Sequence, residues 1–114
     1  MNVNKFTNES ERTTVKVKPG LTRTTLSFVD PLMICKFHED EGTIIELHTH
    51  EAVQNGYVLK GKIKFFLEDG TEFIAEPGSA YVFESMEPHG SIALEETILI
   101  ESFAPMRTDY MDGN

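Results

Sequence analysis

Residues 42–61 read GTIIELHTHEAVQNGYVLKG and are the most informative segment of the chain. It begins and ends on glycine and reads as two apolar strands around a short polar loop, with two of the chain's four histidines in the first strand. Because side chains alternate along a strand, we expect His48 and His50 to share a face, with Cα atoms about 6.6 Å apart. Two neutral imidazoles so arranged can chelate a transition-metal ion. The alternative is a pair of solvent-facing histidines on an edge strand.

Short apolar runs continue on both sides of this stretch. Turn signals such as KPG, EDEG, EDGT and EPGS separate them, and no segment long enough for a helix keeps a 3.6-residue period. In LEDGTEF, Asp69-Gly70 is expected to form a type I′ hairpin turn. The pattern predicts an all-β sandwich or barrel of antiparallel strands. The expected strands are 14–18, 22–28, 32–38, 43–50, 56–60, 62–67, 71–75, 80–84, 91–94 and 97–103.

Composition limits the number of domains and the kinds of partner. A chain of 114 residues fits a single domain, 1–114, with a core at about 14–110 and a polar N-terminal tail. Nineteen acidic against ten basic side chains give a net charge of −9, which disfavours nucleic acid. No apolar run reaches the ~20 residues of a membrane span, and the amino end lacks a secretory signal, so a cytoplasmic protein is expected. Cys35, the one cysteine, is expected to be a small buried hydrophobe.

Two further polar residues accompany the histidine pair. Gln54 follows His50 by four residues, so its amide oxygen could turn back toward the same point, and His89 in EPHG is a candidate fourth ligand. His38 fits no such pattern and is expected at the surface. Imidazole nitrogens and an amide oxygen suit one divalent ion, Zn, Ni, Fe, Co or Mn, without choosing among them. All four groups are neutral, so the charge of the ion would stay uncompensated and make it a stronger Lewis acid.

The spacing of these residues resembles the first sequence motif of the cupin superfamily, with glutamine in place of the usual glutamate. Gly78 and His89 have the separation of the second cupin motif. The resemblance covers residues 32–110 and implies a small double-stranded β-helix, or jelly-roll barrel, that is usually dimeric and holds a metal ion. The motif residues are Gly42, His48, His50, Gln54 and Gly61, and the implied metal ligands are His48, His50, Gln54 and His89.

The carboxy-terminal stretch TILIESFAPMRTDYM, residues 97–111, is the second informative segment. Alternation places Leu99, Glu101 and Phe103 on one face, so a carboxylate lies between apolar neighbours. If that face lines the barrel, burial would raise the pKa of Glu101 and a nearby metal ion would lower it. The alternative is that Glu101 faces solvent on an edge strand. The planar guanidinium of Arg107 is suited to bind a substrate carboxylate through two hydrogen bonds. The alternative for Arg107 is a surface salt bridge with Asp109.

The order of acidic residue, phenylalanine, proline, arginine, aspartate and aromatic residue in this segment resembles the end of the cupins related to the pectin-degradation protein KdgF. In that family the acidic residue, the phenylalanine and the arginine line the pocket beside the metal. The resemblance implies catalytic roles for Glu101 and Arg107 and substrate-binding roles for Phe103 and Arg107. Glu101 stands where that family usually has aspartate, and the family has one residue more between the second histidine and the glutamine.

Three functions are compatible with these residues. The first is a metal-dependent enzyme that opens the ring of a 4,5-unsaturated uronate, a small acidic sugar. The second is an Fe- or Ni-dependent cupin dioxygenase, whose activity would require oxygen. The third is a non-catalytic cupin that binds a small ligand. In each of the three functions the partner is a small molecule. In the first function that molecule carries a carboxylate.

Overall fold

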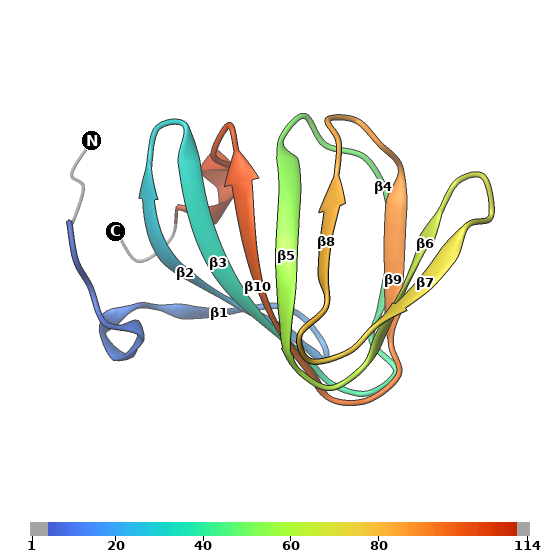
Figure 1. The fold of residues 1–114 in the computed structure, drawn as a ribbon. Coiled ribbons are helices and arrows are strands. Elements are labelled where there is room, and N and C mark those ends of the chain that lie inside the picture. The colour runs from blue at the N-terminus through green and yellow to red at the C-terminus, as the bar shows by residue number, and fades with distance from the viewer. Residues whose placement is uncertain (1–4, 112–114) are drawn as a thin grey trace.

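The computed structural model describes residues 5–111 and confirms the predicted all-β jelly-roll barrel. In this part of the chain the strands form two antiparallel sheets, one in the order β1-β2-β3-β10-β5-β8 and one in the order β4-β9-β6-β7. Figure 1 shows the larger sheet across the left and middle of the view and the smaller sheet at the right. The strands are β1 (Thr14–Lys18), β2 (Leu21–Val29), β3 (Leu32–Glu39), β4 (Ile44–His48), β5 (Val53–Lys60), β6 (Ile63–Leu67), β7 (Glu72–Ala75), β8 (Ala80–Phe83), β9 (His89–Ala93) and β10 (Thr97–Ala104).

The inward faces of the two sheets build the core, with the most regular alternation along β3 and β10. Along β3, Met33, Cys35 and Phe37 are buried while the side chains between them are not, as a strand with one face against the core requires. Cys35 is fully buried, which confirms the expectation of a small buried hydrophobe. Between the sheets, the rings of Phe65 and Phe83 pack with centroids 5.4 Å apart. The apolar core therefore closes part of the barrel and leaves the rest for a cavity.

The histidine strand differs from the prediction in a way that matters for the site. Strand β4 ends at His48, so the expectation that His48 and His50 share a face of one regular strand is wrong. The pairing of β4 with β9 shifts register between Ile45 and His48, so that His48 lies directly opposite His89. A bulge of this kind re-aims the side chains that follow it. Ile45, Glu46, Leu47 and His48 all border the cavity, so plain alternation does not hold along this part of β4.

Two other local predictions need correction. Gln54 lies within β5, which begins three residues earlier than the predicted strand 56–60. The β6–β7 hairpin at LEDGTEF is confirmed, but its turn is not type I′, because that type needs a positive φ at Asp69 as well as at Gly70. Among the described residues only Met86 and five glycines have positive φ, and Gly70 is one of them with φ of 91°. The glycine supplies the left-handed residue that follows a tight turn.

Two short 3-10 helices flank the barrel, η1 (Glu9–Glu11) in the predicted N-terminal tail and η2 (Thr108–Tyr110) after β10. Glu9 in η1 pairs with Lys36 of β3 at 2.8 Å, so the end of that tail lies against the barrel. Residues 1–4 of the tail lie outside the described residues. No helix within residues 5–111 is long and apolar enough to cross a bilayer.

Candidate functional site

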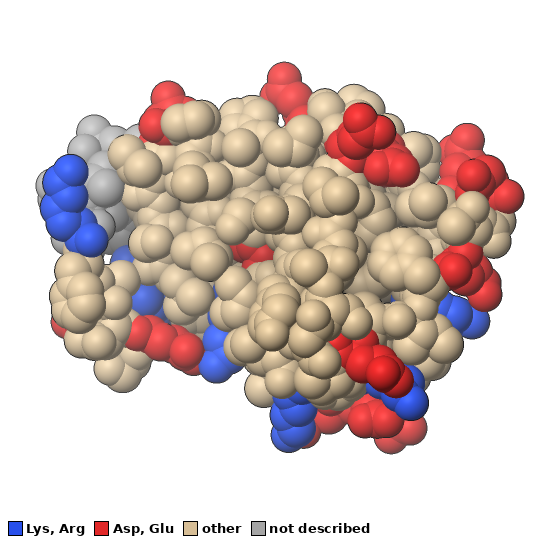
Figure 2. Space-filling model, viewed as in Figure 1, with Lys and Arg blue, Asp and Glu red and all other residues tan. Residues whose placement is uncertain are grey.

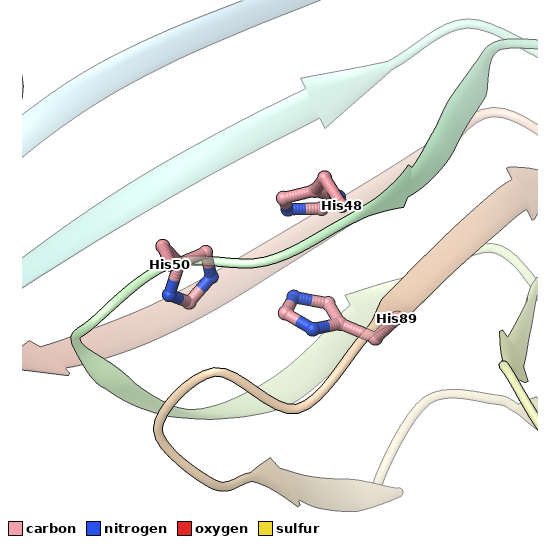
Figure 3. A group of neighbouring side chains, drawn as sticks. All are labelled: His48, His50 and His89. Carbon is pink, nitrogen blue, oxygen red and sulfur yellow. The ribbon is translucent and has the colours of Figure 1, made fainter.

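Three histidines from two parts of the chain come together in the structure (Figure 3). His48 ends β4, His50 lies in the segment that follows, and His89 begins β9. One ring nitrogen from each lies within 4.8 Å of the others, close enough for a single ion. Among the described residues this is the one group of three or more histidine, cysteine or acidic side chains with such spacing.

The backbone fixes the orientation of all three rings. Nδ1 of His48 contacts the carbonyl of Glu46 at 2.9 Å, Nδ1 of His50 that of Ala52 at 2.8 Å, and Nδ1 of His89 that of Glu87 at 2.7 Å. A carbonyl oxygen only accepts, so each Nδ1 carries the proton and donates it. The lone pair of each neutral ring is therefore on Nε2. Hydrogen bonds of this kind normally orient metal-binding histidines and set their tautomer.

Two observations test whether these residues fit a metal ion. Nε2 of His89 is buried and has no hydrogen-bond partner among the described residues. Nε2 of His50 lies 2.9 Å from Oε1 of Gln54, so two atoms that both carry lone pairs face each other when His50 is neutral. Burial lowers the pKa of His50 and lowers that of His89 to about 4, which favours the neutral rings. Neutral imidazoles with free, converging lone pairs fit a divalent cation.

Gln54 connects the histidines to the carboxylate of Glu101. Its amide nitrogen donates to Oε2 of Glu101 at 2.8 Å, while its Oε1 faces His50. Because a carboxylate accepts hydrogen bonds, the NH2 end of the amide faces Glu101 and the oxygen end faces His50. A carboxylate at position 54 would place two negative groups in contact, so the glutamine is the residue that lets an acidic neighbour approach. In this way the amide links the histidine cluster with β10.

Glu101 faces inward and is 6% exposed, which excludes the alternative of a solvent-facing carboxylate. The hydroxyl of Tyr81 donates to the same Oε2 at 2.5 Å. Burial raises the pKa of Glu101, and the bonds from Tyr81 and Gln54 oppose that rise. Gly56 makes room for the tyrosine, because a Cβ there would lie 2.4 Å from the Tyr81 ring. Both hydrogen bonds use Oε2, so Oε1 keeps its acceptor capacity for another group.

Arg107 lies beside two aromatic rings at the end of β10. Its guanidinium carbon is 4.3 Å from the ring centroid of Tyr110 and 5.7 Å from that of Phe103, distances at which a cation is attracted to the ring face. Arg23 stacks on Tyr110 at 4.2 Å. The expected alternative for Arg107 is also present, since its Nη2 pairs with the carboxylate of Asp109 at 3.2 Å. Arg107 therefore has a surface partner and also lines the cavity described next.

These side chains line one cavity of about 490 Å³, a size that holds a whole small ligand. Its walls include every residue to which the sequence assigned a role except His50, which contacts the wall residue Gln54. His38 lies at the surface, where it pairs with Glu96 at 2.8 Å. The predicted residues that line the cavity are His48, Gln54, His89, Glu101, Phe103 and Arg107.

Sequence reasoning missed three residues of this cavity region. Tyr81 and Tyr110 were not singled out, although Tyr81 holds Glu101 and Tyr110 packs on Arg107. Glu39 was missed because the predicted strand stopped at residue 38, yet alternation from Met33 onward would have placed it on the inward face. Glu39 is 3% exposed, and its burial, followed by repulsion from Glu101, raises its pKa to about 7.

The raised pKa of Glu39 predicts a loss of stability with rising pH. Between the ordinary pKa of 4.5 and about 7 the unfolded chain ionises Glu39 while the folded chain keeps it protonated, so unfolding becomes easier. The loss approaches about 3 kcal/mol above pH 7. Glu39→Gln should therefore raise the free energy of unfolding at pH 8 by more than at pH 4.5. Urea unfolding at both pH values measures the difference, with Glu41→Gln on the adjacent exposed turn as the charge control. An equal effect of Glu39→Gln at both pH values would contradict the prediction.

The fold and the site together define a class of protein. A jelly-roll barrel of two antiparallel sheets, with three inward histidines that can hold a metal ion beside a ligand-sized cavity, is the architecture of a small single-barrel cupin. Residues 36–100 match the Cupin domain family, and this span is more than half of the chain. The chain belongs to the cupin family.

Within the cupin family, the chain is similar to particular proteins and solved structures. The chain is 34% identical over 94 residues to the pectin degradation protein KdgF of Dickeya dadantii (strain 3937), a match that covers 81% of this chain and 84% of the relative. The solved structure of KdgF from Halomonas sp. superposes with a TM-score of 0.88 at 32% identity, covering 95% of this chain and 99% of the other. An RmlC-like cupin from Shewanella frigidimarina NCIMB 400 superposes with a TM-score of 0.89 at 27% identity, covering 95% and 96% of the two chains. The resemblance to KdgF seen in the sequence is thereby confirmed.

Proposed function

We propose that this protein is a metal-dependent enzyme that opens the ring of a 4,5-unsaturated uronate, so that the sugar proceeds to a linear keto acid. The observation that carries the proposal is the single cavity in which Glu101 and Arg107 lie beside the histidine cluster. This reaction needs a cation that binds the carboxylate of the substrate and a carboxylate that accepts and returns a proton. Arg107 and Glu101 supply these two groups. The likeness to two proteins named KdgF, one of them described as a pectin degradation protein, supports an acidic sugar as the substrate.

His48, His50, Gln54 and His89 would hold the divalent ion. Its chemistry, once bound, is Lewis acidity that polarises the oxygens of the sugar. The Nδ1 hydrogen bonds to backbone carbonyls keep the histidine lone pairs aimed at one point. The donor set suits Zn, Ni, Fe, Co or Mn.

Arg107 binds the carboxylate of the uronate, and Phe103 packs against the ring. Oε1 of Glu101 accepts the proton of the anomeric hydroxyl, a carbonyl forms at the anomeric carbon, and the bond from that carbon to the ring oxygen breaks. The proton then passes to the ring oxygen and gives an enol, which tautomerises to the linear keto acid. Tyr81 and Gln54 hold Oε2 throughout, so the carboxyl keeps its orientation.

The test is the decay of the ultraviolet absorbance of the unsaturated uronate under argon, with metal-loaded protein and without it. No electron transfer is involved, so a redox-inert ion such as Zn²⁺ should support the rate. A decay no faster with protein than without it contradicts the proposal. Oxygen consumption with another substrate and with Fe²⁺ or Ni²⁺ would favour the dioxygenase instead. Tight binding of the uronate without turnover would favour a binding protein.

Arg107→Lys should raise KM about tenfold while kcat changes much less. Lysine keeps the charge but loses the planar fork that binds a carboxylate through two hydrogen bonds. Steady-state kinetics on the unsaturated uronate separate the two constants. Asp109→Asn is the matched control, because it removes the surface partner of Arg107 at 3.2 Å and leaves the guanidinium in place. If both variants raise KM equally, the salt bridge is what matters and not the fork.

We also infer that the protein is a homodimer joined through the outer face of the six-stranded sheet. Exposed apolar side chains gather there, among them Tyr57 at 47% and Val82 at 68% exposure. In Figure 2 the surface over β10, β5 and β8, in the middle of the view, consists largely of uncharged residues. Acidic side chains lie around its edge. A broad apolar patch with a polar rim is typical of an interface between subunits.

Val82→Glu should convert the dimer to a monomer, because it places a charge in the middle of the apolar patch. Light scattering after size-exclusion chromatography reports the mass. Ile74→Glu on β7 of the other sheet is the matched control, since Ile74 is also exposed, at 54%. A wild-type protein with the mass of one chain would contradict the inference.

A further inference from the structure

Glu39 is a second buried carboxyl of the cavity, and the reaction proposed above does not use it. It ends β3, where it pairs with Leu21 of β2 and Thr97 of β10. Its side chain is 3% exposed and lines the same cavity as Glu101. Carboxyl groups are rarely buried this deeply without a partner, so its position calls for a function.

One oxygen of Glu39 has no partner within the described part of the chain. Its Oε1 is buried and makes no hydrogen bond there, whereas Glu101 receives two. A buried acceptor left unpaired costs free energy that a well-placed donor recovers. Glu39 lines the cavity, so a hydroxyl group of a ligand bound there is suited to supply that donor.

Glu39 is separated from the histidines and from Glu101 along the strands. The side chain of Lys18, which also lines the cavity, donates to the carbonyl of Ile44 at the start of β4, and His48 is four residues further along the same strand. On β10, Thr97 beside Glu39 is likewise four residues from Glu101. Four residues of strand span about 13 Å. The carboxyl of Glu39 therefore adds a polar group to the cavity at a point away from the histidine cluster.

We propose that Glu39 is a substrate-contacting residue that selects hydroxyl-bearing carboxylates, by pairing its free oxygen with the hydroxyl groups of the sugar acid while Arg107 binds the carboxylate. The inference rests on the proposed function in taking a sugar acid as the ligand. A site built to pair a hydroxyl discriminates strongly against a ligand that lacks it, because the buried polar group is then left unpaired. Glu39 thus provides specificity that the histidine cluster and Arg107 do not.

The carboxyl of Glu39 is suited to this work near neutral pH. A pKa of about 7, raised by burial and by Glu101 and lowered by Lys18, means that protonated and ionised forms are both populated. The protonated form donates and accepts, and the ionised form accepts from two hydroxyls. A carboxyl that is partly neutral also repels an entering sugar carboxylate less than a fixed negative charge does.

The test measures binding and not turnover. Titration calorimetry on the metal-loaded protein gives the dissociation constants of D-galacturonate, which has hydroxyl groups, and of cyclohexanecarboxylate, which has none. Wild type is expected to bind galacturonate more tightly. Glu39→Met, which keeps the length but no hydrogen-bonding group, should weaken galacturonate at least tenfold and leave cyclohexanecarboxylate nearly unchanged. Glu39→Gln should keep most of the preference, and Glu41→Met on the neighbouring turn should keep all of it.

Equal galacturonate affinity in wild type and Glu39→Met would overturn the inference. So would a wild type that binds the two carboxylates equally or binds neither, and this result does not depend on any variant folding. The proposed function fails separately. If the protein prefers galacturonate through Glu39 but does not turn over the unsaturated uronate, the ring-opening reaction is wrong and the specificity role of Glu39 stands. If the protein turns over the unsaturated uronate equally well with Glu39→Met, the reaction stands and the specificity role is wrong.

Discussion

The double substitution His48→Ala and His50→Ala is expected to abolish stoichiometric metal binding, with a loss of affinity greater than about 100-fold. Two of the three imidazoles within 4.8 Å of one another are removed, and the remaining His89 with Gln54 is too few ligands for a tight site. Elemental analysis of the dialysed protein gives the metal content per chain. Turnover of the unsaturated uronate should disappear with the metal.

His38→Ala is the matched control for this experiment. His38 is a surface histidine paired with Glu96 at 2.8 Å, far from the cluster in its contacts, so its removal should leave one ion per chain. Full metal content in the double variant would show that the ion is held elsewhere. Circular dichroism of the metal-free double variant should show the β-sheet spectrum of the metal-free wild type, although the loss of the Nδ1 hydrogen bonds to Glu46 and Ala52 should lower its melting temperature.

Glu101→Gln is expected to lower kcat by about 10²- to 10⁴-fold, the usual contribution of a positioned acid or base. The amide keeps the shape of the side chain and the hydrogen bond from Tyr81 but cannot accept the proton of the sugar hydroxyl. Metal content should stay at one ion per chain, since Glu101 contacts Gln54 and not the histidines. Steady-state kinetics and elemental analysis of the same preparation measure both quantities.

Glu68→Gln on the exposed β6–β7 turn controls for the loss of one carboxylate. If Glu101→Gln turns over at the wild-type rate with its metal in place, the carboxylate takes no part in the reaction and another group moves the proton. A variant that loses metal as well as activity would instead assign Glu101 a structural role, through the amide of Gln54.

The sequence predicted the strands well because alternation and turn residues are local signals. It also selected the histidines, but for a reason that does not hold in the structure. His50 lies beyond the end of β4, and His48 reaches the cavity through a bulge against His89. A bulge depends on the partner strand, which a single sequence does not reveal. Spacing selected three histidines that the structure brings within 4.8 Å of one another, while the assumed strand geometry was wrong.

Contacts between distant strands explain the residues that were missed. Tyr81 reaches Glu101 because β8 and β10 both flank β5, with Gly56 leaving space between them. None of these pairings follows from the local pattern around Tyr81. Glu39 is a different case, since one more residue of alternation along β3 would have placed it inward. A charged residue was taken as the end of the strand, whereas here it is a buried carboxyl of the cavity.

In the proposed enzyme, the side chain of Gln54 would stand between the bound ion and the carboxylate of Glu101. Its carbonyl end points toward the histidine cluster and its amino end toward Glu101, so the dipole of the amide lies along the line from the cluster to the carboxylate. This orientation suits a cation on one side and an anion on the other. A glutamate at this position would bring a negative charge to the ion and weaken its Lewis acidity. The neutral spacer would thus let an electrophile and a Brønsted base work side by side, each with its reactivity intact.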